Sequence, residues 1–330
     1  MSTEIKVFLI EEDKQGGPEQ LQKRLANPNI QLAHGKRPPE DADYEILIGA
    51  FPSQEFVEAS RNLKSLIIPY AGPPQATQEL MREYPHIAVH NAPYNSIASA
   101  ETALALMLGC AKFLAKGDMN LRRGDWTLRY SVQPQLILHG RTALILGYGR
   151  IGRRMAPVCH ALGMEVIGIR RTLQEEDVQD EWAEVYGVDR LHEQLSRAHL
   201  LLAALPGTPE TIGLIGTQEL SLLKDGAIVV NVGRGMVIDE TALYNALISG
   251  KLSGAGIDAW YNYPRSVEER TQTMPSQYAF HEMENVILSP HRAGWLGSED
   301  ESRMAMLAEM LNELAASGAL PNPVNMELGY

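Results

Sequence analysis

Cysteine and basic residues are scarce in this sequence. Only two cysteines, Cys110 and Cys159, occur among 330 residues, and neither stands in the spacing of a metal site. This usage argues against a disulfide scaffold, so we expect a cytoplasmic protein that binds no metal. Lysine and arginine number 29 against 41 aspartate and glutamate residues, which gives a net charge of −12. Such a charge argues against nucleic acid as a partner, although a few local arginines can still bind an anionic substrate.

Long apolar runs are also absent. The longest, Ala103 to Ala111, is far too short to span a bilayer. The charged N-terminus, Met1 to Lys6, leads directly into a predicted strand, so we expect neither a signal peptide nor a membrane partner. The length of 330 residues, with 45% hydrophobic residues, instead predicts about two globular domains with a substantial core.

A glycine turn at residues 147–152 follows an apolar run of strand length, residues 142–146, and precedes a predicted helix at 153–162. A second strand is predicted at 164–169. In this context the first glycine makes the turn, the second lets a pyrophosphate approach the backbone, and the third lets the helix pack on the strand. The unit therefore predicts dinucleotide binding, whereas an isolated match would more often be chance. Its predicted cofactor contacts are Gly147, Tyr148, Gly149, Arg150, Ile151 and Gly152.

Strands and helices alternate on both sides of this turn. Before it, strands are predicted at 5–10, 30–33, 44–49, 63–69 and 87–90, with helices at 18–26, 54–59 and 75–82. After it, strands are predicted at 199–205, 227–232, 255–258 and 286–288, with helices at 190–198, 218–223 and 239–249. A long helix at 96–116 is predicted to connect two lobes, and another at 298–316 ends the chain. This alternation predicts an α/β protein with parallel sheets covered by helices on both faces.

Three polar residues lie at or just after the ends of predicted strands of the second lobe, at the edge where such sheets bind ligands. Arg234 lies between glycines and suits the bidentate capture of a carboxylate, with a surface ion pair as the alternative. Asp258 could hold an amide of the cofactor or cap a loop. His291 lies in a Pro/Gly frame, which makes it a candidate general acid or base.

Together these motifs resemble the D-isomer-specific 2-hydroxyacid dehydrogenase family, which includes formate and 3-phosphoglycerate dehydrogenases. The resemblance covers nearly the whole chain, because several motifs match in order and spacing. They are Gly140-Arg141-Thr142, the glycine turn, Leu205-Pro206, Pro209-Glu210-Thr211, residues 231–235, Gly256-Ile257-Asp258, Pro290-His291 and Pro321-Asn322-Pro323-Val324-Asn325.

The resemblance implies two Rossmann-like, doubly wound parallel-sheet domains with the active site in the cleft between them. A flavodoxin-like substrate domain is expected at 1–97 and 296–330, and the dinucleotide-binding domain at 98–295. A homodimer through the cofactor domain is also implied.

The resemblance further implies roles for single residues. Arg234 would bind the substrate carboxylate, and His291 would protonate the keto oxygen as hydride arrives from the nicotinamide. The backbone of Ala71 and Gly72 would meet the carboxylate, and Asn95 matches an asparagine that faces the substrate in formate dehydrogenases. The remaining implied cofactor contacts are Leu205, Pro206, Val232, Gly233, Asp258 and Gly294.

The chain departs from the family pattern near the histidine. Most members have a Glu-Pro pair shortly after the aspartate, and this glutamate orients and charges the histidine. Here the pair is Tyr263-Pro264, so a neutral phenol stands where the carboxylate is expected. A phenol can hydrogen-bond His291 but adds no charge, which predicts a lower histidine pKa. Glu268 or Glu269 could fold back as a substitute.

A second departure concerns the cofactor. NAD-specific members end the second strand of the domain with an acid that accepts the ribose 2′-OH. Here Arg170, Arg171 and Thr172 stand at this position, and they suit a 2′-phosphate. We therefore expect NADP, with NAD as the alternative if both arginines face solvent.

Three functions are compatible with these sequence features. The first is NADPH-dependent reduction of a small 2-oxo acid, such as glyoxylate or hydroxypyruvate, to the D-2-hydroxy acid. The second is a cofactor-binding regulator of the same fold with weak or no catalysis. The third is an enzyme on a substrate other than a keto acid, since some relatives oxidise formate or phosphite.

Overall fold

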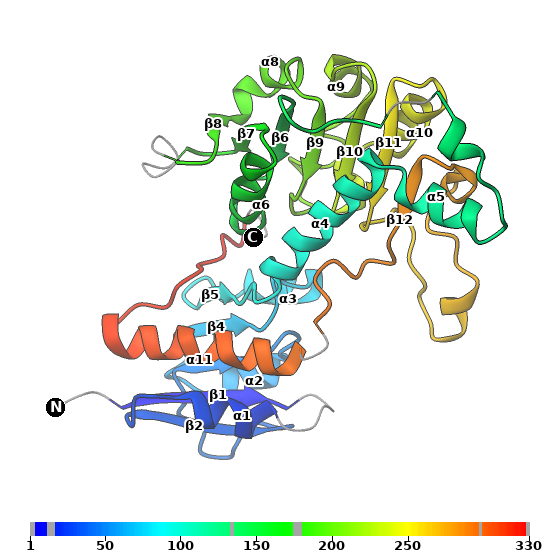
Figure 1. Cartoon of the computed structure of the whole chain (residues 1–330). Helices are drawn as coiled ribbons and strands as arrows, with labels where there is room; N and C mark the ends of the chain where they lie inside the picture. Colours follow the sequence, from blue (N-terminus) through cyan, green and yellow to red (C-terminus); the bar gives the residue numbers. More distant parts are fainter. Residues whose placement is uncertain (1–3, 12–16, 133–134, 174–179, 297–298, 328–330) are drawn as a thin grey trace. The chain divides into compact units, whose positions relative to one another are not determined.

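The computed structural model describes residues 4–11, 17–132, 135–173, 180–296 and 299–327. The chain divides into two compact units (Figure 1). Unit 1 comprises residues 1–95 and 296–330, and unit 2 comprises residues 96–295. The C-terminal segment thus folds with the first third of the chain.

Unit 1 is built on a five-stranded parallel sheet with the order β2-β1-β3-β4-β5. Its strands are β1 (Ile5–Ile10), β2 (Ile30–Gly35), β3 (Ile46–Ile48), β4 (Ser65–Ile68) and β5 (Ala88–Asn91). Its helices are α1 (Gly17–Arg24), α2 (Gln54–Ala59), α3 (Gln75–Met81) and α11 (Glu299–Ser317). This strand order is the flavodoxin-like one.

Successive residues of a strand point to opposite faces of the sheet. Because successive residues of these strands are apolar, both faces of the sheet are apolar. Val7 and Leu9 of β1 pack in one core with Leu21 of α1 and Leu307 of α11. Phe8 packs on the opposite face, in a core that α2 and α3 complete. The unbroken apolar strands of the sequence therefore lie between two layers of helices.

Unit 2 contains a seven-stranded parallel sheet with the order β12-β11-β10-β9-β6-β7-β8. Its strands are β6 (Thr142–Leu146), β7 (Glu165–Arg170), β8 (Glu184–Gly187), β9 (Leu200–Ala203), β10 (Ala227–Asn231), β11 (Leu252–Ile257) and β12 (Val286–Leu288). Its helices are α4 (Ser96–Ala111), α5 (Leu114–Leu121), α6 (Arg150–Ala161), α8 (Leu191–Leu195), α9 (Thr217–Leu222) and α10 (Glu240–Ile248). The sheet order reverses between β6 and β9, which is the position where a Rossmann sheet binds its ligand.

Helices again cover both faces of this sheet. Ala143 and Ile145 of β6 pack with α4 and α6, whereas Leu144 and Leu146 pack with α8, α9 and α10. The prediction of two parallel α/β sheets is therefore confirmed in both units.

Three details of the sequence prediction were wrong. The expected single helix at 96–116 is two helices, because Phe113 adopts a left-handed conformation (φ 52°) that ends α4 and turns the chain into α5. Strand β8 was missed, since its short, half-buried sequence lacks an apolar run. Helix α6 begins at Arg150 instead of 153, directly after the second glycine of the turn.

Among the described residues, no single helix is long and apolar enough to cross a membrane. Helices α4 and α5 meet the length and composition of a membrane span only together, as a pair bent by 65°.

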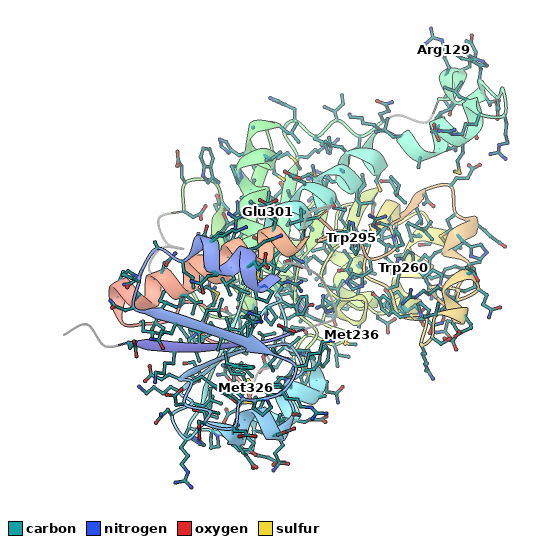
Figure 2. The ribbon with its side chains drawn as sticks, turned by 90° about the horizontal axis from the view of Figure 1, so that it is seen from below. Arg129, Met236, Trp260, Trp295, Glu301 and Met326 are labelled. Atoms are coloured by element: carbon teal, nitrogen blue, oxygen red, sulfur yellow. The ribbon has the colours of Figure 1, made fainter. Side chains whose placement is uncertain are left out.

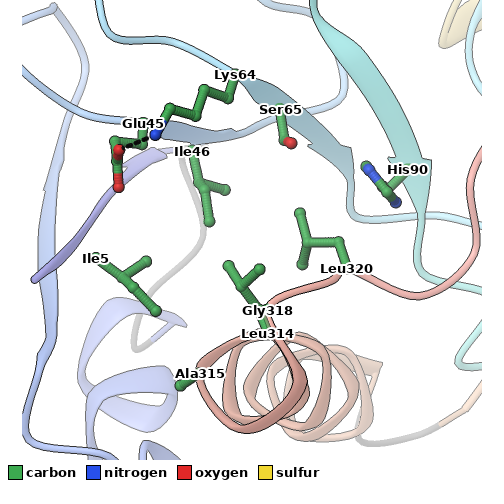
Figure 3. A pocket seen from close by; sticks show the side chains of 10 residues that line it. All are labelled: Ile5, Glu45, Ile46, Lys64, Ser65, His90, Leu314, Ala315, Gly318 and Leu320. Atoms are coloured by element: carbon green, nitrogen blue, oxygen red, sulfur yellow. Dashed lines mark hydrogen bonds and ion pairs between the residues drawn. The ribbon is translucent and has the colours of Figure 1, made fainter. Parts of the chain in front are cut away.

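A cavity of about 420 Å³ lies in unit 1, between the sheet and the C-terminal end of α11 (Figure 3). Ile5, Ile46 and Ser65, which line it, begin β1, β3 and β4. His90 also lines it, and its Nδ1 lies 2.8 Å from the carbonyl oxygen of Pro321. The cavity therefore lies toward the amino ends of the strands, whereas the candidate substrate loops of this unit follow their carboxyl ends.

Candidate functional site

The glycine turn after β6 has the shape that a dinucleotide requires. Gly147 has a φ of 98°, which a residue with a side chain rarely adopts. A Cβ on Gly152 would lie 2.6 Å from the carbonyl oxygen of Gly147, so this glycine allows α6 to approach the strand. At Gly149, by contrast, a Cβ would meet no atom within 4 Å. The open space beside Gly149 and the N-terminus of α6 fit a pyrophosphate.

The side chain of Tyr148, within the same turn, is 1% exposed. Its ring lies against Gly168 of β7, and its hydroxyl donates to Asp180 at 2.8 Å. Its backbone N–H donates to the carbonyl of Ile169 at 2.9 Å. The structure thus gives Tyr148 a packing role, whereas Arg150 is exposed and Ile151 half-buried at the start of α6.

The loops after β9, β10 and β11 converge on Arg234. A Cβ on Gly233 would lie 2.5 Å from the carbonyl oxygen of Leu205, and one on Gly235 would collide with the backbone of Trp260. Glycines on both sides of Arg234 therefore let its segment pass closely between two neighbouring loops. Trp260, and Met236 just after Gly235, are labelled in Figure 2. Leu205 and Pro206 are half-buried here, and Val232 and Gly233 are buried.

Arg234 is exposed, and its Nη1 donates to the carbonyl oxygen of Gly233 at 2.9 Å. The described residues give it no carboxylate partner, so the surface ion pair considered as the alternative is not seen in that part of the chain. Asn231 fixes the backbone, because its side-chain amide donates to the Arg234 carbonyl at 3.0 Å and its carbonyl oxygen accepts the N–H of Gly233 at 3.0 Å. A guanidinium held in this way is available to an anion.

Asp258 anchors the loop that carries His291. It is 0% exposed, and its carboxylate accepts hydrogen bonds from the Ser289 hydroxyl and from the backbone N–H groups of Arg292 (2.8 Å) and Ala293 (2.9 Å). Of the two roles considered for Asp258, the geometry therefore supports the loop cap. Contact with the nicotinamide amide stays a prediction, as does contact with the half-buried Gly294.

His291 has a φ of 54°, a left-handed conformation that is uncommon for a residue other than glycine. Its backbone N–H donates to the carbonyl of Ser289 at 3.0 Å. The loop anchored by Asp258 maintains this conformation, which directs the imidazole toward the loop after β11.

That loop supplies the partner of the imidazole. The hydroxyl oxygen of Tyr263 lies 2.7 Å from Nδ1 of His291 and accepts the backbone N–H of Trp260 at 2.9 Å. Because the Trp260 N–H occupies one acceptor position, the phenol can direct its own hydrogen to Nδ1 of a neutral imidazole. The neutral ring then carries its hydrogen on Nε2. Glu269 is not a carboxylate partner of His291, since it accepts the backbone N–H of Arg265 at 2.7 Å within its own loop.

The electrostatics of this group follow from burial and from Arg234. Partial burial of the ring lowers the pKa of His291 from its ordinary value of 6.5, the nearby Arg234 charge lowers it further, and Asp258 opposes the shift. Burial raises the pKa of Tyr263 above 10.0, so the phenol keeps its proton near neutral pH. These causes differ from the one expected from the sequence, so a histidine pKa below that of a Glu-paired enzyme stays a prediction.

The end of β7 carries the residues expected to bind the 2′ substituent of the ribose. Arg170 is half-buried, and Arg171 and Thr172 are exposed. The exposed Arg171 side chain is paired, because its Nη1 donates to Glu210 at 3.1 Å. Glu210 belongs to the loop after β9.

The predicted substrate residues Ala71, Gly72 and Asn95 belong to unit 1. Ala71 and Gly72 follow the carboxyl end of β4, and the side-chain amide of Asn91 donates to the Ala71 carbonyl at 2.6 Å. Arg303 of α11 supports the same loop, since its Nη1 donates to the Tyr70 hydroxyl at 2.7 Å. The part of Ala71, Gly72 and Asn95 in substrate binding stays a prediction.

Two contributors to the site are not apparent from the sequence. The backbone N–H of Trp260 orients Tyr263, and no sequence signal distinguishes a backbone donor of this kind. Glu210 pairs with Arg171, and the only signal was its place in the Pro209-Glu210-Thr211 motif. Among the described residues, no three His, Cys, Asp or Glu side chains gather to hold a metal.

Comparison with known proteins shows the family of the chain. Residues 104–293 match the family described as D-isomer specific 2-hydroxyacid dehydrogenase, NAD binding domain. The D-3-phosphoglycerate dehydrogenase of Archaeoglobus fulgidus is 31% identical over 274 residues, which are 82% of this chain and 49% of that protein. The chain therefore spans about half the length of that relative. The glyoxylate reductase of Aeropyrum pernix is 36% identical over 237 residues, 70% of this chain and 67% of that protein.

A solved structure extends the match to the fold of the whole chain. It is the D-isomer specific 2-hydroxyacid dehydrogenase of Xanthobacter autotrophicus Py2 in complex with NADPH and MES, at 24% identity. The TM-score is 0.75, and the match covers 99% of this chain and 100% of that one. With its glycine turn, its Arg234 loop and the family match over residues 104–293, the chain belongs to the D-isomer specific 2-hydroxyacid dehydrogenase family.

Proposed function

We propose that the protein reduces a small 2-oxo acid to the D-2-hydroxy acid with NADPH. The observation that carries this proposal is the hydrogen bond of 2.7 Å between Tyr263 and Nδ1 of His291, in a loop that abuts the Arg234 segment, since a Cβ on Gly235 would collide with the Trp260 backbone. An anion-binding group and a proton-transferring group thus lie together in the unit that carries the glycine turn. The name of the Aeropyrum pernix relative, glyoxylate reductase, supports a substrate of this class.

The chain's own residues have separate tasks in this reaction. Arg234 binds the substrate carboxylate, for which its planar fork of donors is suited. A reduced nicotinamide, when bound, supplies the hydride. His291 in its protonated form gives the proton on Nε2 to the keto oxygen, while Tyr263 orients the ring through Nδ1. Because the lowered pKa reduces the protonated fraction, the reduction should be fastest on the acid side of neutrality.

NADPH is favoured by the end of β7. Arg170, Arg171 and Thr172 present two guanidinium groups and a hydroxyl at the position that reads the ribose 2′ substituent. The pyrophosphate would lie beside Gly149, at the N-terminus of α6.

We also propose that the protein is a homodimer, through apolar side chains of unit 2. Leu114, Trp126, Tyr130 and Ile137 are 61%, 60%, 78% and 68% exposed and lie on or close to α5. Exposed apolar groups concentrated in one segment are typical of a protein interface. Light scattering of the purified protein tests this, and a monomer at micromolar concentration contradicts it.

The experiment that tests the proposed reaction is a panel of 2-oxo acids, from glyoxylate to phenylpyruvate, assayed with NADPH and NADH in parallel. Turnover that prefers NADPH supports the proposal, and the best substrate indicates the size of the pocket. Tight binding of the cofactor without turnover on any 2-oxo acid would instead favour the regulatory function or a substrate of another class.

A further inference from the structure

The loop after β9 places a carboxylate, that of Glu210, beside the carboxyl end of β7, where the acid expected in an NAD-binding protein is missing. Strands β7 and β9 both pair with β6, on its two sides. Arg171 follows β7, and Glu210 lies in the loop after β9, so their 3.1 Å ion pair joins the strands that flank β6. The carboxyl end of β6, with its glycine turn, is the place where a Rossmann sheet holds the dinucleotide.

The backbone that carries Glu210 is firmly held. The Thr211 hydroxyl donates to the carbonyl of Pro206 at 2.7 Å and accepts the N–H of Thr208 at 2.8 Å. Thr208 and Thr211 are 5% and 8% exposed, whereas the Glu210 side chain is 55% exposed. Glu210 therefore extends from a fixed turn toward Arg171 and remains accessible to a ligand.

The two partners have opposite preferences for the ribose 2′ position. A guanidinium binds a 2′-phosphate through charge-assisted hydrogen bonds, and a carboxylate accepts a hydrogen bond from a 2′-hydroxyl but repels a phosphate. A 2′-phosphate must therefore share Arg171 with Glu210, whereas a 2′-hydroxyl meets both a donor and an acceptor.

We propose that Glu210 is a specificity-determining residue of the cofactor site, which takes the place of the acid missing from β7. It accepts the ribose 2′-hydroxyl of NADH and weakens the hold of Arg171 on the 2′-phosphate of NADPH. The protein consequently accepts both cofactors, with a smaller preference for NADPH than Arg170 and Arg171 alone would give. This inference rests on the proposed use of NADPH only for the role of Arg171.

Three adenosine fragments test the inference without turnover: 2′,5′-ADP, 5′-AMP and 2′-deoxy-5′-AMP, with affinities measured by calorimetry or ligand-observed NMR. The wild type should bind 5′-AMP more tightly than its 2′-deoxy form, and Glu210→Ala should remove this difference. Glu210→Ala and Glu210→Gln should also raise the affinity for 2′,5′-ADP relative to 5′-AMP by at least about fivefold. Arg171→Gln should lower that ratio and leave the discrimination between 5′-AMP and its 2′-deoxy form in place.

Glu184→Ala is a matched control. Glu184 is 60% exposed and pairs with Arg197 at 3.1 Å. It begins β8 and so lies toward the amino ends of the strands, whereas Arg171 and Glu210 follow carboxyl ends. It should change neither ratio. If Glu210→Ala leaves both ratios as in the wild type, the inference is overturned. If the wild type prefers 5′-AMP to 2′,5′-ADP, the proposed use of NADPH fails, but loss of 2′-hydroxyl discrimination in Glu210→Ala still supports the role of Glu210.

Discussion

The hydroxyl oxygen of Tyr263 lies 2.7 Å from Nδ1 of His291 and at the same time accepts the backbone N–H of Trp260. A neutral phenol is thus the partner of the imidazole, where the resemblance in sequence implies a carboxylate. The phenol orients the imidazole as the carboxylate would, but it brings no negative charge to stabilise the imidazolium ion. The pH range of the reaction should therefore depend on residue 263.

Tyr263→Glu should raise the pKa of His291 and move the acidic optimum of 2-oxo acid reduction to higher pH. The sign follows from linkage: the reduction needs the protonated ring, so its rate falls as pH rises through the His291 pKa, which in the wild type lies below 6.5. A carboxylate beside the imidazole favours the charged ring and shifts this fall upward. The measurement is kcat/KM for the reduction against pH.

Tyr263→Phe should lower kcat more than it raises KM, because Nδ1 then loses its partner and the ring its orientation. Tyr261→Phe is the matched control, since the hydroxyl of the half-buried Tyr261 donates to the Ile238 carbonyl at 3.0 Å and does not contact His291. The control should keep the wild-type pH profile. Identical profiles for the wild type, Tyr263→Glu and Tyr263→Phe would contradict a positioning role for Tyr263.

Arg234→Gln should raise KM for a 2-oxo acid by roughly 10- to 100-fold, because hydrogen bonds to a charged group contribute about 1.5–3 kcal/mol. The same change should also raise the pKa of His291, since the Arg234 charge lowers it in the wild type. Arg190→Gln provides a control at an exposed arginine that follows β8 and pairs with Glu193 at 2.6 Å. An unchanged KM in Arg234→Gln argues against carboxylate binding by this residue.

Two glycines of the same turn should respond differently to a side chain. Gly149→Val should leave the thermal midpoint of unfolding nearly unchanged but weaken dinucleotide binding, because space is open there and a side chain would fill it. Gly152→Val should instead lower stability by about 1–3 kcal/mol, as a Cβ meets the Gly147 carbonyl at 2.6 Å. Thermal melts with and without cofactor separate the effects. Equal loss of stability in both variants would contradict the assignment.

Asp258→Asn should destabilise the protein by about 1–3 kcal/mol, because an amide nitrogen cannot accept all the hydrogen bonds that the carboxylate receives from residues 289–293. It should also raise the hydrogen-exchange rate of the Arg292 and Ala293 amides. Asp225→Asn is the control, since Asp225 is 94% exposed in its ion pair with Lys251. Wild-type exchange at these two amides in Asp258→Asn would show that the aspartate does not anchor the loop.

The sequence by itself determined the parallel sheets, apart from strand β8, and the position of the glycine turn. Apolar runs such as residues 142–146 can only be buried on both faces, which requires a parallel sheet between helices. Gly147 and Gly152 were informative because the turn leaves no room for a side chain. The helix predicted at 239–249 is also present, and Asp239 caps it by accepting the N–H of Ala242 at 2.8 Å.

Only the tertiary structure decided which side chains become partners. Tyr263 and His291 are separated by 28 residues, and Arg171 and Glu210 by 39, so no local pattern links either pair. The parallel sheet brings the loops after successive strands to one edge, and the hydrogen bonds there select the partners. The same packing gave Asp258 its hydrogen bonds to the His291 loop and buried the side chain of Tyr148. A motif fixes the backbone path, whereas the direction of a side chain depends on the neighbours that the fold supplies.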